Sequence, residues 1–479
     1  MNTRIVAKIL GIVLLIEAAL MLLPMTTALL YHESALPFLY SIAILLAAGG
    51  ALNAIRPKSQ DIYAKEGFVC VGAAWILMSA FGALPFVFSG EIPFYIDAFF
   101  ETVSGFTTTG ATILTAVEPM SKGCAFWRLF THWVGGMGVL VFIMAVLPAS
   151  GGNYMHIMRA EVPGPTVGKL VPRLRETARI LYLIYIALTA METLLLILGG
   201  MSFYEALVHS FATAGTGGFS TRNASIGGFN SAYIEMVIAT FMMIFGVNFN
   251  IYYLLLLGQF RSVFKSEELR VYLGVILAAT VLIAANIASQ VGGFVRGLRY
   301  SYFSVTTVVS TTGFCTADFD TWPEFSKWLL FLLMFIGGCA GSTGGGMKVS
   351  RIIILCKSFI HELKKQAVPS RVQRIWFEDR PVAEETVKSV HVFSLAYILI
   401  LLICGLVLSL EKCDFITSMT ASLACLSNVG PGLSMVGPTG NYAFFSWWSK
   451  LMLSFEMLFG RLEIFPLAYL LSPPVWRRR

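Results

Sequence analysis

The sequence predicts an all-α integral membrane protein built from two N-terminal helices followed by four pseudo-symmetric repeats. Of its 479 residues, 57% are hydrophobic and only 13% are charged, which is about half the charge of a soluble domain. Apolar runs long enough to cross a bilayer recur along the whole chain. Four of the gaps between these runs hold a shorter apolar run that ends in a cluster of small residues, mostly glycine, serine and threonine.

Ten membrane-spanning helices are expected. The first two cover residues 5–30 and 36–55, and the other eight form four pairs: 67–89 with 124–148, 178–199 with 231–257, 271–291 with 323–346, and 388–410 with 443–470. Between the members of each pair lies an apolar segment of about a dozen residues, which is too short to span. The corresponding domains are 1–66 for the N-terminal helices and 67–160, 161–262, 263–380 and 381–479 for the repeats.

The distribution of charge predicts the orientation. Lysine and arginine concentrate in the segments 56–66, 149–179, 259–270 and 347–388, whereas the loops that alternate with them, such as 31–37, hold few. Basic loops stay in the cytoplasm, so both termini are expected there, and the four short segments are expected to enter the membrane from outside. These anchors in membrane lipid account for most of the basic residues behind the net charge of +7, without nucleic acid as a partner.

The four clusters of small residues align without gaps on Gly110, Gly218, Gly313 and Gly430. The two residues before each glycine are Thr108 and Thr109, Thr216 and Gly217, Thr311 and Thr312, and Asn428 and Val429. Six positions before each glycine stands a small residue, namely Ser104, Ala212, Thr307 and Ala424. The glycines are 108, 95 and 117 residues apart, which fits one helix–re-entrant pore loop–helix unit in each repeat.

Irregular backbone at membrane depth is tolerated only where it is buried in protein or lines a water-filled cavity. A potassium-type filter replaces the hydration shell of the ion with rings of backbone carbonyls, and glycine permits the left-handed dihedrals that this requires. We therefore expect the backbone of the four aligned segments to bind a cation as substrate, with no cofactor. The alternative is small-residue packing between helices, which explains any one cluster better than four in register.

At these residues the sequence resembles the TrkH/TrkG/KtrB/HKT superfamily of cation transporters. The similarity covers nearly the whole chain and includes the stretches SGFTTTGAT, ATAGTGGFSTRNASI, STTGFCTADF, GGCAGSTGGGMKVSR and FGRLEIFP. The length and the two extra N-terminal helices favour the bacterial TrkH branch. The resemblance implies potassium uptake across the bacterial cytoplasmic (inner) membrane, a homodimer, and a cytoplasmic nucleotide-binding regulatory protein of the TrkA type. The fourth segment matches least well, because SNVGP lacks the threonine before the glycine.

The second helix of the third repeat contains the stretch GGCAGSTGGGMK (Gly337–Lys348), in which six of twelve residues are glycine. A straight helix here would cost about 1 kcal/mol per glycine relative to alanine, so we expect a broken helix and an irregular loop across the pore. No other repeat has such a stretch. The resemblance supports an intramembrane gating loop, with Gly337, Gly338, Gly341, Ser342, Gly344, Gly345, Gly346 and Lys348 as its gate residues.

This stretch has two other interpretations. A phosphate-binding P-loop does not fit, because Met347 stands between Gly346 and Lys348. A flexible packing notch between helices is the alternative to a gate.

Arg461 lies well inside the last apolar segment, where an arginine is energetically costly and marks a functional site. We expect it to face the cavity, contact the glycine-rich loop and limit cation flow when the gate is closed. The alternatives are an ion pair with Glu456 or Glu463, or a side chain that reaches to the cytoplasmic interface.

The same features bear on two competing functions. A sodium- or proton-coupled symporter is the alternative to a conducting pore, but symporter folds often contain inverted repeats, whereas these repeats run parallel. An intramembrane enzyme is not expected, because HExxH, GxSxG and paired intramembrane aspartates are missing from the sequence. The eight cysteines form no CxxC and no Cys/His cluster, so no disulfide framework or resident metal site is expected.

Overall fold

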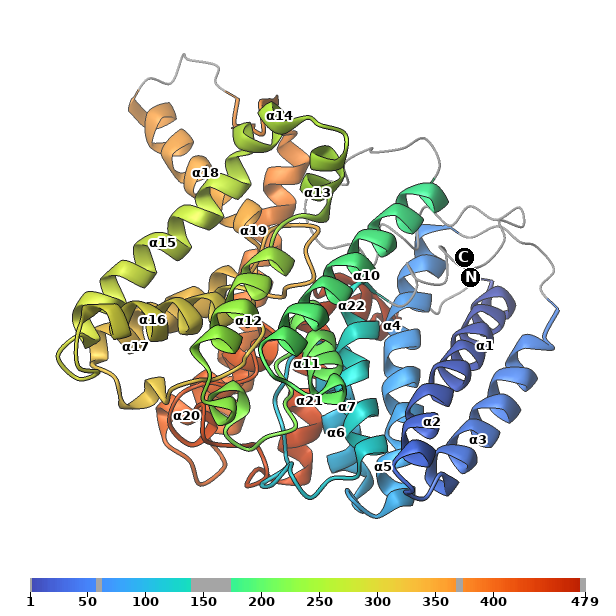
Figure 1. Ribbon diagram of the computed structural model, residues 1–479. Coiled ribbons are helices and arrows are strands. Elements are labelled where there is room, and N and C mark those ends of the chain that lie inside the picture. The colour runs from blue at the N-terminus through green and yellow to red at the C-terminus, as the bar shows by residue number, and fades with distance from the viewer. Residues whose placement is uncertain (1, 57–62, 139–173, 368–373, 474–479) are drawn as a thin grey trace.

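The computed structural model describes residues 2–56, 63–138, 174–367 and 374–473. Within these residues nearly all regular structure is helical, and the one sheet is a two-stranded hairpin (Figure 1). The expected all-α class is confirmed. Residues 139–148 of the expected helix 124–148 and most of the basic segment 149–179 lie outside the described residues.

The N-terminal helices pack against each other through glycine. These helices are α1 (Thr3–Leu20), α2 (Leu22–Leu30) and α3 (Leu36–Asn53). A Cβ atom on Gly11 of α1 would lie 2.6 Å from the backbone nitrogen of Asn53 and 2.8 Å from the carbonyl oxygen of Gly49, both on α3. The two backbones therefore touch, which is how helices commonly pack in a membrane.

The remaining elements are grouped by the four expected repeats, in chain order. The first contains α4 (Ala64–Gly82), α5 (Leu84–Ser89), α6 (Tyr95–Phe106) and α7 (Lys122–Gly136). The second contains α10 (Leu174–Leu198), α11 (Phe203–Gly215), η1 (Ser225–Phe229), α12 (Ala232–Phe245) and α13 (Phe249–Leu256), and α14 (Phe260–Lys265) links it to the third. The third contains α15 (Glu267–Ile287), α16 (Phe294–Val309), η2 (Phe319–Thr321), α17 (Glu324–Ile336), α18 (Val349–Ala367), β1 (Trp376–Phe377) and β2 (Arg380–Pro381). The fourth contains α19 (Glu384–Leu408), α20 (Phe415–Leu426), η3 (Ser434–Val436), α21 (Trp447–Arg461) and α22 (Phe465–Leu471).

Fewer helices than expected are long enough to cross a membrane. Among the described residues, six helical stretches are long and apolar enough, and a seventh is added if α12 and α13, which bend by 92°, count as one span. The sequence predicted ten. In the second, third and fourth repeats the difference arises in the second helix, because α12, α17 and α21 have only 14, 13 and 15 residues. In the first repeat, the expected helix 124–148 continues beyond the described residues.

A break in the second helix is therefore not confined to the repeat with the glycine-rich stretch. The helix α17 stops at Ile336, as expected, but α12 also stops at Phe245 before the bend, and α21 stops at Arg461 before α22. Sequence analysis missed the latter two breaks because neither holds a run of glycines. Broken helices leave backbone carbonyls without intrahelical partners, and these carbonyls become important in the site described below.

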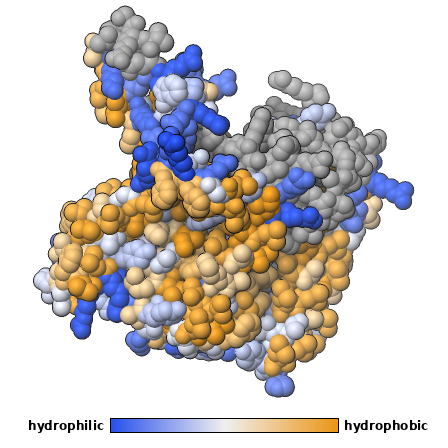
Figure 2. Space-filling view, turned by 45° about the horizontal axis from the view of Figure 1, so that its top comes forward, coloured by the Kyte–Doolittle hydropathy of each residue, from blue (hydrophilic) through white to orange (hydrophobic). Residues whose placement is uncertain are grey.

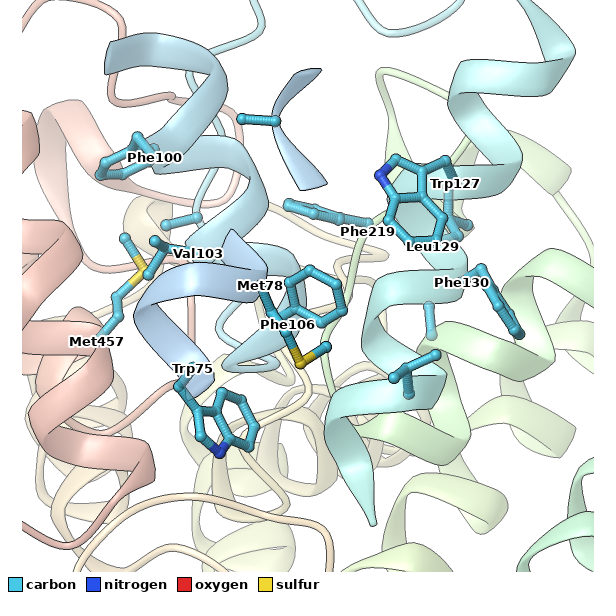
Figure 3. Close-up of a cluster of buried hydrophobic side chains, with 14 of the residues drawn as sticks. Trp75, Met78, Phe100, Val103, Phe106, Trp127, Leu129, Phe130, Phe219 and Met457 are labelled. Carbon is cyan, nitrogen blue, oxygen red and sulfur yellow. The ribbon is translucent and has the colours of Figure 1, made fainter. Parts of the chain in front are cut away.

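A large aromatic and aliphatic core surrounds the first repeat (Figure 3). Figure 3 shows side chains from α4, α6, α7 and α21 converging with Phe219, which follows α11 in the chain. The buried members drawn there include Trp75, Met78, Phe100, Val103, Phe106, Trp127, Leu129, Phe130 and Met457. This core fixes the backs of the short helices α6 and α11.

The outer surface is apolar over the main body and polar on a projecting lobe. Figure 2 shows hydrophobic residues covering much of the body, whereas hydrophilic residues gather at the base of the lobe. In Figure 1, α14, the adjoining end of α15 and the far end of α18 extend beyond the other helices, on the side where α1 begins. This arrangement is typical of a body in lipid with a lobe in water.

We predict that Gly11→Ala destabilises the protein by about 1–3 kcal/mol, because the added methyl group forces α1 away from α3. Gly50→Ala is the matched control, since a Cβ atom on Gly50 of α3 meets nothing within 4 Å. This control is expected to be neutral or to stabilise by up to about 1 kcal/mol. Thermal unfolding in detergent measures both changes, and equal melting temperatures for the two variants would contradict the prediction.

Candidate functional site

The four aligned glycine segments adopt the same backbone conformation. The residue two positions before each glycine has a left-handed backbone, with φ of 56°, 56°, 60° and 54° for Thr108, Thr216, Thr311 and Asn428. Each glycine is left-handed as well, with φ of 79°, 75°, 85° and 95° for Gly110, Gly218, Gly313 and Gly430. In every segment the amide before the glycine donates to the carbonyl of the small residue five positions earlier, at 2.9, 2.9, 2.8 and 2.8 Å for Thr109, Gly217, Thr312 and Val429.

The four segments close into a ring. A Cβ atom added to each glycine would lie 2.5 Å or less from the carbonyl oxygen that precedes the next glycine. The contacts run in chain order, from Gly110 to Gly217, from Gly218 to Thr312, from Gly313 to Val429 and from Gly430 back to Thr109. The space beside every glycine is thus occupied by a carbonyl oxygen of its neighbour. Rings of carbonyl oxygens can replace the water around a cation.

Different side chains support the ring from behind in each repeat. In the first and third repeats, hydroxyl pairs join neighbouring positions, Thr107 with Thr109 at 2.8 Å and Ser310 with Thr312 at 2.7 Å. In the fourth repeat, the amide of Asn428 donates to Thr109 Oγ1 at 3.0 Å and to the carbonyl of Met457 at 2.9 Å. The loosest sequence match is therefore tied directly to the first segment.

In the second repeat, His132 takes the place of these hydroxyl groups. Glycine at positions 215 and 217 leaves room for the histidine, since a Cβ atom at either position would collide with it. His132 Nε2 accepts the backbone N–H of Phe219 at 3.3 Å, and Nδ1 lies 2.8 Å from the carbonyl oxygen of Gly105. Because Nε2 accepts, Nδ1 carries the proton and donates. This histidine therefore supports the first and second segments together, through Gly105 and Phe219.

A buried ion pair that sequence analysis missed joins the first two segments. Arg128 Nε lies 2.6 Å from Glu101 Oε1, and both side chains are almost fully buried. Glu101 also accepts from Thr112 Oγ1 at 2.8 Å and from the backbone N–H of Ile113 at 3.0 Å. Arg128 donates to the carbonyl of Ser220 at 3.2 Å and stacks on the ring of Phe219 at 3.5 Å. Two opposite charges inside apolar helices were the available sequence signal.

A cavity of about 180 Å³ opens on one side of the ring. All four glycines line it, together with residues just after each glycine, such as Ala111, Phe219 and Pro431. Tyr442, also in its wall, donates its hydroxyl hydrogen to the carbonyl of Gly430 at 2.7 Å. The two cationic groups in the described lining, Arg128 and Arg222, are paired with Glu101 and Glu205.

The glycine-rich loop contacts the ring. The backbone N–H of Gly345 donates to Thr311 Oγ1 at 2.6 Å, and a Cβ atom on Gly344 would lie 2.9 Å from the carbonyl oxygen of Ser310. The loop separates α17 from α18, and nearly all of its residues are buried. Gly337, Gly341, Gly346 and Lys348 have positive φ, and Lys348 Nζ donates to the carbonyl of Gly344. Ser342 and Gly338 lie within the same buried stretch.

Arg461 bridges the glycine-rich loop and the end of α7. Its Nη1 donates to the carbonyl of Thr343 at 2.6 Å, and its Nη2 donates to the carbonyls of Gly135 and Gly136, each at 2.6 Å. The acids considered as alternative partners are engaged elsewhere. Glu463 pairs with Arg351, and Glu456 accepts from Ser422. The expected contact between Arg461 and the loop is thus present in the structure.

The chain is similar to known cation transport proteins over nearly its whole length. The TrkH family, described as "Cation transport protein", matches residues 36–287 and 294–474. The Trk system potassium uptake protein TrkH of Escherichia coli (strain K12) is 37% identical over 100% of both chains, and TrkG of the same strain is 31% identical over 100% of both. The crystal structure of the potassium transporter TrkH from Vibrio parahaemolyticus is similar with a TM-score of 0.89 and 34% identity, covering 100% of both chains.

We predict that Arg128→Ala destabilises the protein by about 3–5 kcal/mol, because Glu101 then keeps a buried charge without its partner. Arg222→Ala is the matched control, since Arg222 also pairs with a glutamate but its side chain is 36% exposed. An exposed pair contributes about 0–1 kcal/mol. Thermal unfolding in detergent compares the two variants, and a loss for Arg128→Ala no larger than for Arg222→Ala would refute the buried role.

Proposed function

Because this chain belongs to the TrkH family of cation transport proteins, we propose that it takes up potassium through the ring formed by its four glycine segments. The observation that carries the proposal is the closure of the ring, in which a carbonyl oxygen of each segment lies beside the glycine of another. Such oxygens compensate a potassium ion for the water that it loses on entry. The potassium ion is thus the substrate, and transport needs no cofactor.

The ring binds the cation with main-chain oxygens rather than with charged side chains. The proposed binding residues are Thr108, Thr109, Gly110, Thr216, Gly217, Gly218, Thr311, Thr312, Gly313, Asn428, Val429 and Gly430. Left-handed residues at alternate positions turn successive carbonyls in the same direction. The short helices α6, α11, α16 and α20 end at the ring, so their partly negative C-termini favour a cation there.

The glycine-rich loop acts as the gate of this pore. It touches Thr311 on one side and receives Arg461 on the other. In the closed state, the guanidinium group of Arg461 adds a positive charge near the path and holds the loop against the ring. To open the pore, the loop must leave these contacts. Because the loop is not helical, it can move without breaking helical hydrogen bonds.

Regulation and assembly follow the family pattern. The chain functions in the bacterial inner membrane as a homodimer, with both termini and the projecting lobe in the cytoplasm. A nucleotide-binding regulatory protein of the TrkA type acts on the lobe, since α18 continues directly from the glycine-rich loop into it. In this orientation, each repeat begins on the cytoplasmic side of the membrane and its glycine segment lies toward the outside. The repeats have the domain borders given in the sequence analysis.

We predict that Gly313→Ser lowers the selectivity for potassium over sodium by on the order of tenfold or more, because a side chain in left-handed backbone costs about 1–3 kcal/mol. The Cβ atom would also collide with the carbonyl of Val429. Gly200→Ser is the matched control, since Gly200 has φ of 93° but a Cβ atom there meets nothing within 4 Å. Ion flux into proteoliposomes measures the selectivity, and unchanged selectivity in Gly313→Ser would sink the proposal.

Repeating the assay without sodium and without a pH gradient tests the symport alternative.

We predict that Arg461→Ala raises potassium leak through the closed protein by roughly tenfold, since hydrogen bonds from a charged group contribute about 1.5–3 kcal/mol. Arg461→Lys keeps the positive charge, but an ammonium group cannot donate to all three carbonyls as the planar guanidinium group does. An intermediate leak is therefore expected. Flux is measured in proteoliposomes without any regulatory protein. Wild-type leak and gating in Arg461→Ala would contradict the proposed role.

A further inference from the structure

A buried carboxylate at the start of α15 holds the glycine-rich loop. Glu268 is 5% exposed. Its Oε1 accepts the backbone N–H of Ala340 at 2.7 Å and the backbone N–H of Ser350 at 3.1 Å. Ala340 lies in the loop and Ser350 in the first turn of α18, so one oxygen connects the loop to the helix that follows it.

Other contacts fix the same part of the loop to the second repeat. The backbone N–H of Cys339 donates to the carbonyl of Gly246 at 2.9 Å, and the backbone N–H of Phe249 donates to the carbonyl of Gly341 at 3.1 Å. These bonds join the loop to the bend between α12 and α13. Glu268 completes the attachment from the side of α15, where Ala340 would otherwise leave a buried N–H without an acceptor.

The hairpin β1–β2 holds the first turn of α15. Glu378 Oε1 accepts from Ser266 Oγ at 2.8 Å and from the backbone N–H of Glu268 at 3.0 Å. Ser266 is also the N-cap of α15. The hairpin is braced from α18, because Lys357 Nζ donates to Glu267 Oε2 and to the carbonyl of Trp376, each at 2.7 Å.

The turn of this hairpin is in a strained conformation. Glu378 and Asp379 have φ of 50° and 57°, although neither is glycine. Residues other than glycine occupy this region only where their surroundings hold them. The contacts of Glu378 with Ser266 and with the backbone of Glu268 are such a restraint, and they orient the first turn of α15.

We propose that Glu268 is the positioning residue of the glycine-rich loop and that the hairpin 376–381 sets its orientation through Glu378. This inference rests on the proposed function, in which the loop closes the pore. A partner or a movement that lifts the hairpin removes an acceptor from the first turn of α15. The Glu268 side chain then shifts, Ala340 loses its acceptor, and the loop is released from one side.

Four variants of the full chain test the proposal. Glu268→Ala removes the acceptor, whereas Glu268→Gln removes the charge but keeps an amide oxygen at the same place. Glu378→Ala removes the hairpin contact, and Asp379→Ala is its matched control, because the same substitution meets similar left-handed strain at the exposed neighbouring residue. Glu378→Ala also keeps the test valid if Glu268→Ala does not fold.

Two readouts are measured on each variant in membranes. The first is potassium leak in proteoliposomes. The second is the rate at which a thiol reagent modifies Cys339 of the loop, followed by mass spectrometry, which does not depend on ion flux. Cys425 in α20 is a buried cysteine outside the loop and reports general loosening, and Cys356 in α18 is exposed and reports reagent activity.

The proposal expects Glu268→Ala and Glu378→Ala to raise both rates by about tenfold, the effect of losing a hydrogen bond to a charged group. Glu268→Gln gives a smaller rise than Glu268→Ala, because a neutral hydrogen bond replaces one to a charged group. Asp379→Ala stays within about twofold of wild type. Three results would each overturn it: no rise in Cys339 modification in both alanine variants, an equal rise in Glu268→Gln, or a parallel rise at Cys425. An absence of potassium flux both in the wild type and in every variant whose Cys339 becomes reactive refutes the proposed function instead, while Cys339 still reports on the loop.

Discussion

The structure depends on a close approach between backbones. At each of the four aligned glycines, the position that a side chain would take is filled by a carbonyl oxygen of the next segment. This contact closes the ring only if all four positions lack a Cβ atom, so the constraint is shared by residues more than 300 positions apart. The hydroxyl pairs, His132, Asn428 and the Glu101–Arg128 pair all lie behind the segments and hold this arrangement.

Two charged groups inside the apolar body, those of Arg461 and Glu268, are stabilised by the backbone of broken or ending helices. Helix C-termini leave carbonyl groups without partners and carry a partly negative potential. Arg461 uses this, because it donates to Gly135 and Gly136 at the end of α7 and to Thr343 in the loop. Glu268 uses the opposite polarity, because it accepts N–H groups from the loop and from the first turn of α18. Breaking a helix thus supplies the partners that a buried charge requires.

The four glycine segments share one backbone geometry, but different side chains support them. The second repeat has glycine at 215 and 217 and uses a histidine from α7, whereas the first and third use hydroxyl pairs. In the third repeat, the interruption lies against the ring through Gly345 and Thr311. Because the support differs, one side of a fourfold ring can carry a movable element while the others keep the ring in shape.

The sequence by itself determined the helical class, the four repeats and the position of the glycine segments, because apolar length and glycine spacing are local properties that each segment displays alone. It also indicated the break at Gly337–Lys348, where six glycines stand together. It did not reveal the ends of α12 and α21, the Glu101–Arg128 pair, or Glu268 as an acceptor for Ala340. Only the tertiary structure decided these, since each depends on a partner from a distant part of the chain, and the energy of a buried polar group is set by that partner rather than by its neighbours in sequence.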